Sequence, residues 1–210
     1  MIIDVWSDVV CPWCLIGKRR LEKAVASLPA GIQVEIRHRA FQLQPDIQGV
    51  VSTTEHLASK YRLDKEAVAR MQANVCSIAD GEGLCYDLEN TLSGNTRDAH
   101  RLLLWAQSQG KHAELLEAMY SAYFEKSEAL FTDDDLIAVA TRAGFDAAEI
   151  EAVLNTTDFD QQVREDQQLA SNLGATGVPF FVIQNKYGVS GAQDSSVFVN
   201  AFEQVLNESN

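Results

Sequence analysis

Several features are scarce in this 210-residue chain, and each absence excludes a class of protein. The 17 lysines and arginines are outnumbered by 30 aspartates and glutamates, and no run of basic residues occurs. A net charge of −13 therefore argues against a nucleic-acid partner, because phosphate contacts need clustered cations. No stretch approaches the roughly 18 consecutive apolar residues that a membrane-crossing helix needs, so we expect no membrane association.

The first residues also lack the marks of a secretory signal, since MIIDVW contains no basic stretch ahead of a long apolar segment. We therefore expect a cytoplasmic protein, in which a stable structural disulfide would be unusual. Only four cysteines occur, at positions 11, 14, 76 and 85. In a reducing compartment, a close pair such as Cys11 and Cys14 is more often catalytic or metal-binding than structural.

The strand patterns lie at the two ends of the chain. Residues 2–6 predict a short buried strand, 12–28 an amphipathic helix, and 33–41 a second strand, which together make a right-handed βαβ unit. Alternation in the second strand places on its buried face Val34, Ile36, His38 and Ala40. Residues 178–183 and 187–190 predict two strands joined by a tight turn, and a final helix is expected near 195–207.

Between these ends, the chain is helical almost throughout. Helices are predicted at 53–61, 64–80, 95–109, 112–126, 132–143, 146–154 and 158–173. The sequence therefore predicts an α/β protein of βαβ…ββα order with a large all-helical insertion. Residues 1–45 and 174–210 would form one discontinuous domain, and residues 46–173 would form the insertion packed on it.

The sharpest chemical signal is Cys11-Pro12-Trp13-Cys14, between the first strand and the first helix. Cys11 would stand where free backbone amides and the helix dipole stabilise a sulfur anion. Pro12 suits the first helical turn, because its missing N–H costs nothing there. Cys14 would lie about 5–6 Å away at Cβ, so a small adjustment lets the sulfurs bond. We predict an exposed, nucleophilic Cys11 and a more shielded, resolving Cys14, with Pro12 and Trp13 tuning the redox potential.

The other two cysteines leave alternatives open. A C-x-x-C pair can supply half of a zinc site, with Cys76 and Cys85 as the other half. Eight residues separate these two, whereas such zinc ligands usually lie about two to four apart, so we expect no metal. Cys76 and Cys85 could form a second redox pair, but two small, half-buried side chains are the simpler interpretation.

A second motif, Gly177-Val178-Pro179-Phe180, leads into the later buried strand. A proline there cannot donate to the sheet. A cis bond before Pro179 would set backbone groups beside Cys11, although cis bonds are a small minority of X–Pro bonds. An ordinary trans proline is the alternative, and only the combination with the cysteine motif favours cis.

Four segments carry a resemblance to a known family. Residues 7–14 (SDVVCPWC), 176–181 (TGVPFF) and 189–193 (VSGAQ) resemble the DsbA family, and residues 95–101 (NTRDAHR) resemble its FrnE-like branch. The resemblance covers essentially the whole chain. It implies a thioredoxin fold with a helical insertion, a cis Pro179 facing Cys11, and dithiol–disulfide exchange with protein, peptide or small thiol substrates.

The same superfamily includes glutathione-dependent kappa-class transferases and 2-hydroxychromene-2-carboxylate isomerases. Those enzymes typically carry serine where this chain has Cys11, and they activate the thiol of glutathione. The presence of both Cys11 and Cys14 favours redox chemistry, with glutathione as a candidate co-substrate and no other cofactor. The alternatives are a glutathione-dependent isomerase or transferase, and a noncatalytic, chaperone-like module that holds unfolded chains. The sequence gives no indication of oligomeric state.

Three further residues are candidates for the cleft. The carboxylate of Asp8 would oppose the helix dipole near Cys11 or accept a proton, and its simpler role is a turn or helix cap. Asn95 and His100 are candidates because the corresponding segment of the glutathione-dependent relatives lies near the active site. His38 is expected to be a packed, hydrogen-bonded core histidine.

Overall fold

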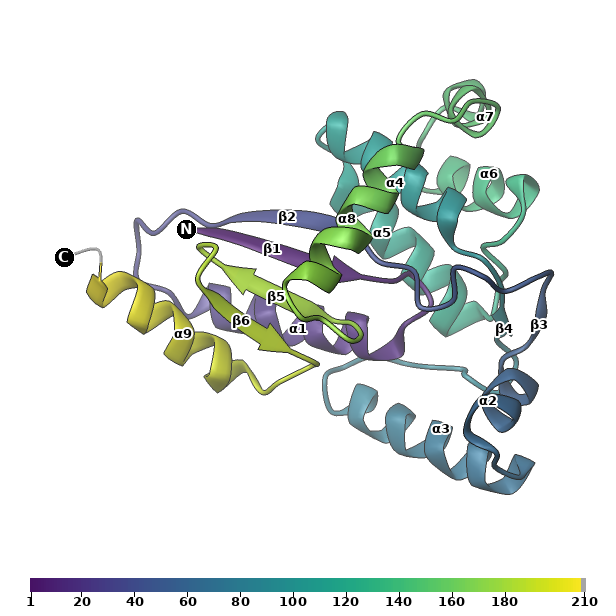
Figure 1. Cartoon of the computed structure of the whole chain (residues 1–210), viewed down its shortest axis with the longest axis horizontal. Coiled ribbons are helices and arrows are strands. Elements are labelled where there is room, and N and C mark those ends of the chain that lie inside the picture. The colour runs from purple at the N-terminus through teal and green to yellow at the C-terminus, as the bar shows by residue number, and fades with distance from the viewer. Residues whose placement is uncertain (209–210) are drawn as a thin grey trace.

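The computed structural model describes residues 1–208, and a four-stranded sheet lies at its centre (Figure 1). The strands are β1 (Ile2–Ser7), β2 (Glu35–Ala40), β5 (Phe180–Ile183) and β6 (Tyr187–Ser190), in the order β2-β1-β5-β6. β1 is parallel to β2, whereas β5 is antiparallel to both β1 and β6. Both ends of the chain therefore meet in one sheet, where Val5 of β1 pairs with Phe181 of β5.

Because side chains alternate along a strand, the sheet buries apolar groups on both faces. The helices that cover it are α1 (Pro12–Ala26), α8 (Asp160–Asn172) and α9 (Ser195–Glu208). Ile3 and Phe181 belong to a core cluster with α1 and α9. Trp6 and Phe180 point to the other face, into a cluster that includes Ala170 of α8. In Figure 1, α8 crosses in front of the sheet and α1 lies behind it.

The remaining helices form the insertion, on the right of Figure 1. They are α2 (Thr53–Tyr61), α3 (Lys65–Asp80), α4 (Arg97–Ser108), α5 (His112–Tyr120), the π-helical turn η1 (Ser121–Glu125), α6 (Asp133–Arg142) and α7 (Ala147–Leu154). Each predicted helix is present near its predicted bounds. A short antiparallel pair, β3 (Val51–Ser52) with β4 (Leu92–Ser93), was not predicted.

The insertion shares its core with α1, since Leu15 and Ile16 lie in one cluster with Leu102 of α4 and Leu115 of α5. α8 was assigned to the insertion from the sequence, yet it packs against β2 of the sheet. The predicted domain bounds stay a prediction, and positions 209–210 of the second segment lie outside the described residues.

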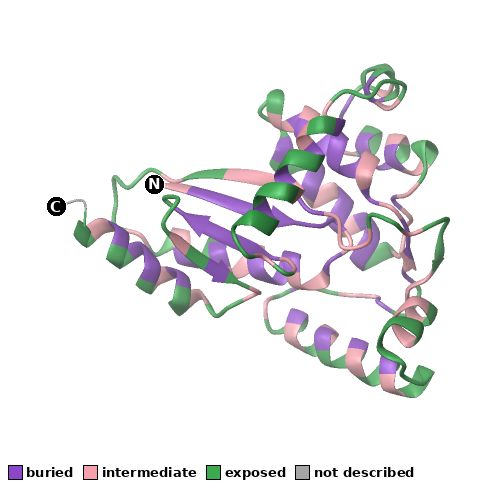
Figure 2. Ribbon diagram, viewed as in Figure 1, coloured by how far each residue is buried: buried purple, intermediate pink, exposed green. Residues whose placement is uncertain are grey.

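β2 departs from its predicted pattern. Ile36 was expected on a buried face, but it is 36% exposed, and of the four inward positions only Ala40 is buried. That part of the prediction was wrong because β2 is an edge strand, and only its C-terminal end is well covered. Ala40 packs with Leu104 of α4 and Val163 of α8. Figure 2 shows the contrast between β2 and the buried β1 beside it.

Two histidines stack where the sheet meets the insertion. The ring centroids of His38 on β2 and His112 at the start of α5 lie 3.8 Å apart. Desolvation of the ring lowers the pKa of His38, a half-buried residue, to about 4, and that of the buried His112 to about 2, because shielding from water disfavours the imidazolium. His38 is packed as expected, but its Nδ1 has no hydrogen-bond partner within the described chain.

We predict that this pair makes stability fall as pH falls below about 6.5. In the unfolded chain both imidazoles take up protons near pH 6.5, whereas in the folded protein they stay neutral until the pH is far lower, so protons favour the unfolded state. The midpoint of urea unfolding should therefore decrease between about pH 7 and 5, above the range where most carboxylates titrate.

The double variant His38→Phe/His112→Phe keeps an aromatic stack and should have a flatter profile over that window. A wild-type midpoint that does not change between these pH values would contradict the assignment.

Candidate active site

Cys11 stands at the N-terminus of α1, directly after the turn that follows β1. It is the N-cap residue, with Pro12 as the first helical residue. Within this described turn, no side chain caps the backbone amides and no acidic residue is present, so the positive end of the helix is left to the sulfur. The Cys14 N–H donates to the Cys11 carbonyl at 2.9 Å, which places the second cysteine one turn into the helix.

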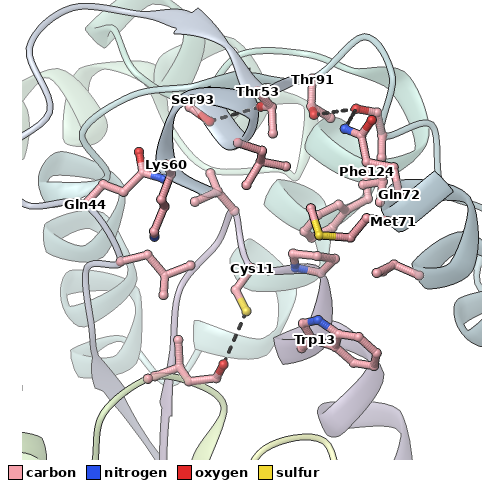
Figure 3. Close-up of a pocket in the computed structure, with 18 of the residues that line it drawn as sticks. Cys11, Trp13, Gln44, Thr53, Lys60, Met71, Gln72, Thr91, Ser93 and Phe124 are labelled. Atoms are coloured by element: carbon pink, nitrogen blue, oxygen red, sulfur yellow. Dashed lines mark hydrogen bonds between the residues drawn. The ribbon is translucent and has the colours of Figure 1, made fainter. Parts of the chain in front are cut away.

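The second predicted motif lies against the Cys11 sulfur. Cys11 Sγ donates to the carbonyl oxygen of Val178 at 3.5 Å, as the dashed line in Figure 3 marks. The Val178–Pro179 peptide bond is cis. Pro179 itself packs toward Gly17 on α1, so the loop before β5 and the first helix meet at the cysteine pair.

Cys11 lines a pocket of about 670 Å³ between the sheet and the insertion (Figure 3). Pro12, Trp13 and Val178, which the sequence indicated, line it as well. The insertion contributes apolar and uncharged polar side chains, including Leu57, Met71, Gln72, Thr91, Ser93 and Phe124. Among the described lining residues, only Lys60 of α2 carries a charge.

Cys11 is less exposed than predicted. Its exposed fraction is 3% and that of Cys14 is 2%, so the expectation of an exposed tip was wrong. Trp13, Val178 and the insertion close around the sulfur, and the two cysteines differ in what they face: Cys11 faces the pocket, and Cys14 does not line it. Burial raises the pKa of the Cys14 thiol well above its usual value, and the adjacent Cys11 raises it further. Both cysteines are free thiols.

None of the three weaker candidates, Asp8, Asn95 and His100, lines the pocket. Asp8 and His100 are buried together, with Asp8 Oδ1 3.3 Å from His100 Nε2. Asp8 Oδ2 accepts from the Leu43 N–H at 2.8 Å. Asn95 contacts the same loop further along, where its side-chain amide donates to the Pro45 carbonyl at 2.7 Å and its Oδ1 accepts from Gln42 Nε2 at 2.8 Å. Asn95 therefore fixes the loop that follows β2.

Tyr86 is a site residue that the sequence analysis missed. Its hydroxyl donates to the Pro12 carbonyl at 2.9 Å, and its ring stacks on Phe124 with centroids 4.7 Å apart. Tyr86 follows α3 and is far from the motif in sequence, so only the fold brings them together. The Sγ of Cys76 lies 3.8 Å from the Tyr86 carbonyl, while Cys85 is exposed, and both cysteines are free. Across residues 1–208, no three His, Cys, Asp or Glu side chains are grouped as metal ligands.

Comparison with known proteins identifies relatives over the full length. A family model described as the DSBA-like thioredoxin domain matches residues 2–203. A crystal structure of a probable DsbA oxidoreductase, SCO1869 from Streptomyces coelicolor, is 41% identical, with a TM-score of 0.94 over 99% of this chain and 91% of that one. YwbO of Bacillus subtilis, described as uncharacterized, is 25% identical over 95% of this chain and 94% of its own.

More distant structures share the fold alone. The cytosolic disulfide reductase DsbM from Pseudomonas aeruginosa, solved with GSH, is 16% identical, with a TM-score of 0.64 over 100% of this chain and 98% of that one. A 2-hydroxychromene-2-carboxylate isomerase is also 16% identical, with a TM-score of 0.70 over 100% of this chain and 98% of that one. In the described part of this chain, no helix combines the length and apolar character required to span a bilayer.

Gly17 generates a prediction about the contact between α1 and the Pro179 loop. A Cβ at this position would lie 2.9 Å from Pro179 Cγ and 3.2 Å from Phe181 Cζ. Alanine in an unobstructed helix is favoured over glycine by about 1 kcal/mol, whereas overpacking costs about 1–3 kcal/mol. We therefore expect Gly17→Ala to lower the free energy of unfolding in urea.

Gly188→Ala is the matched control, because its Cβ would meet Phe180 at an ordinary 3.6 Å. A Gly17→Ala protein more stable than the wild type would mean that helix and loop are not in close contact.

Proposed function

This chain belongs to the family of DsbA-like thioredoxin domains, and on that premise we propose that it catalyses thiol–disulfide exchange through Cys11 and Cys14. One observation carries the proposal: Cys11 is the N-cap of α1 and lines the pocket, and Cys14 follows one turn into the helix. The positive end of the helix dipole favours a sulfur anion, which is the nucleophile in such exchange.

The reaction divides between the two sulfurs. The Cys11 thiolate attacks one sulfur of a substrate disulfide, a mixed disulfide forms, and the other substrate sulfur leaves as a thiolate. Cys14 then loses its proton and attacks the Cys11 sulfur. The Cys11–Cys14 disulfide forms, and the second substrate sulfur leaves. Run in reverse, the same steps oxidise a substrate dithiol.

The environments of the two thiols suit these roles. Because its pKa is raised, Cys14 stays protonated until the mixed disulfide brings a target sulfur beside it. Pro12, Trp13 and Val178 line the approach to Cys11, and with Pro179 they would shape the groove for substrate.

Protein or peptide thiols and glutathione are the proposed substrates. The pocket volume of about 670 Å³ falls within the range of about 300–1,000 Å³ typical of small-ligand sites. Its apolar lining suits a peptide segment, and Lys60 offers a cation for a carboxylate of glutathione or a peptide. DsbM, which shares this fold, was solved with GSH. We propose the same cytosolic setting for this chain.

Cysteine variants test the proposal. Cys11→Ser should reduce the rate of insulin disulfide reduction to that of the uncatalysed reaction, because the nucleophile is lost. Cys14→Ser should keep the first attack and accumulate a mixed disulfide at Cys11, detected by mass spectrometry of the intact protein. Cys85→Ser is the control and should match the wild type, since this exposed thiol lies outside the pocket lining.

The outcomes separate the candidate functions. Insulin reduction that survives Cys11→Ser would contradict the proposal. A glutathione-dependent turnover that survives the same change would favour the isomerase or transferase alternative. Suppression of client aggregation without any exchange by the wild type would favour a holding module.

A further inference from the structure

Tyr86 reaches from the insertion into the cysteine motif. Its hydroxyl donates to the Pro12 carbonyl at 2.9 Å, although the two residues are 74 positions apart in the chain. Its half-buried ring stacks on Phe124, a residue of the pocket lining, with centroids 4.7 Å apart. The hydroxyl therefore contacts the main chain between the two cysteines, at the residue that follows Cys11.

The segment that carries Tyr86 is fixed along α3. After the helix ends, the chain turns and runs back beside it. Three hydrogen bonds join the two, from the Leu84 N–H to the Ala79 carbonyl at 3.0 Å, from the Cys76 thiol to the Tyr86 carbonyl at 3.8 Å and from Gln72 Nε2 to the Leu88 carbonyl at 3.0 Å. Positions 79, 76 and 72 lie about one helical turn apart on one face of α3. α3 therefore holds the main chain of Tyr86 in place.

The carbonyl that Tyr86 binds shares its peptide unit with the Trp13 N–H. In a helix the N–H groups point toward the N-terminus, where Cys11 is the N-cap residue. An N-cap side chain accepts from the N–H of the second or third helical residue, which here are Trp13 and Cys14. The Cys14 N–H already donates to the Cys11 carbonyl at 2.9 Å. Of the two, the Trp13 N–H is therefore the one left for a Cys11 thiolate.

A hydrogen bond to the carbonyl of a peptide unit makes its N–H a stronger donor. Donation to the oxygen draws electron density toward it, and such strengthening amounts to about 10–30% per bond. Burial raises the pKa of the Tyr86 hydroxyl far above its usual value, and negative charge on Cys11 and Cys14 raises it further. The hydroxyl therefore stays protonated, and remains a donor, throughout the pH range in which thiols exchange.

We propose that Tyr86 is a positioning residue that stabilises the Cys11 thiolate through the Pro12–Trp13 peptide unit and so makes the cysteine pair more oxidising. This inference rests on the proposed function. The polarised Trp13 N–H favours the charged sulfur of the reduced form over the neutral sulfur of the disulfide.

Exchange with glutathione disulfide reports this balance. Two electrons pass from the Cys11–Cys14 dithiol to glutathione disulfide, the protein S–S bond forms, the glutathione S–S bond breaks, and the two thiol protons leave with two molecules of glutathione. A weaker donor at position 86 destabilises the reduced protein, so it moves this equilibrium toward the protein disulfide.

Other ionisable groups surround Cys11 and Tyr86, and removal of the Tyr86 hydroxyl leaves them in place. They are Asp8 in the turn after β1, Cys14 and Arg19 of α1, Lys60 of α2, Cys76 of α3, His100 of α4, Tyr120 of α5 and Tyr123 of η1. Burial raises the pKa of Tyr120 well above its usual value and that of Tyr123 to about 12. A change in pH dependence on substitution of Tyr86 alone therefore reports its hydroxyl.

Tyr86→Phe removes the hydroxyl and keeps the ring on Phe124. The rate at which iodoacetamide alkylates Cys11 is measured by peptide mapping from about pH 4 to 9, because only the thiolate reacts. We expect the rate–pH curve to move to higher pH, so that the rate on its rising part falls about two- to fivefold while the alkaline plateau is unchanged. The equilibrium constant for oxidation of the pair by glutathione disulfide at neutral pH should rise by a similar factor.

Tyr123→Phe is the matched control. The Tyr123 hydroxyl also donates to a main-chain carbonyl, that of Leu92 at 2.6 Å, and its ring packs edge-on against Phe124 with centroids 4.9 Å apart. Because Leu92 belongs to β4 and not to the cysteine motif, neither the curve nor the equilibrium should shift. A ring-fluorinated tyrosine at position 86 tests the opposite direction: its more acidic hydroxyl is a stronger donor, so the curve should move to lower pH.

The two possible failures give different results. A wild-type protein that neither forms the Cys11–Cys14 disulfide with glutathione disulfide nor reduces insulin would refute the exchange activity itself. A Tyr86→Phe protein with the wild-type alkylation curve and redox equilibrium would overturn the role of Tyr86 alone. A change by the same factor at every pH would also overturn it, because Tyr86 would then only shape access to Cys11.

Discussion

The site depends on one placement: the Cys11 sulfur lies between the positive, N-terminal end of α1 and the carbonyl oxygen of Val178. Strand order produces it. β1 ends just before the cysteine motif, and its neighbour β5 begins just after Val178, so the antiparallel pair brings both motifs to the same end of the sheet. Gly17 then lets α1 lie close against the Pro179 loop.

The insertion completes the site by covering it. Glu117 of α5 receives hydrogen bonds from Lys18 and Arg19 of α1, and these partners lower its pKa to about 2 despite its burial. From the segment after α3, the Tyr86 hydroxyl reaches the Pro12 carbonyl inside the motif. The insertion therefore both encloses the pocket and contacts the cysteine motif at Pro12. This explains why Cys11 is buried although its place at a helix start suggests exposure.

Local sequence patterns predict most of the helices and strands, and the features that they fail to predict have a common cause. The sequence predicts the helices, the strands of the sheet and the Cys11-to-Cys14 motif. It can do so because periodicity, capping residues and spacing are properties of contiguous residues. β3 and β4 were missed because two-residue strands have no period to detect. Three other features depend on contacts between segments that are distant in the sequence, and no local pattern predicts such contacts. They are the exposure of Ile36, the contact of Tyr86 with Pro12 and the pairing of Asp8 with His100.

Competition between two thiols of the same chain tests the central claim most directly. Cys85 is exposed and Cys11 is 3% exposed, so accessibility alone favours alkylation of Cys85. If the helix end stabilises the Cys11 thiolate, limiting iodoacetamide at about pH 6 should modify Cys11 first, as peptide mapping by mass spectrometry would measure, because only the thiolate reacts. Preferential modification of Cys85, with Cys11 reacting only in alkaline solution, would contradict the account.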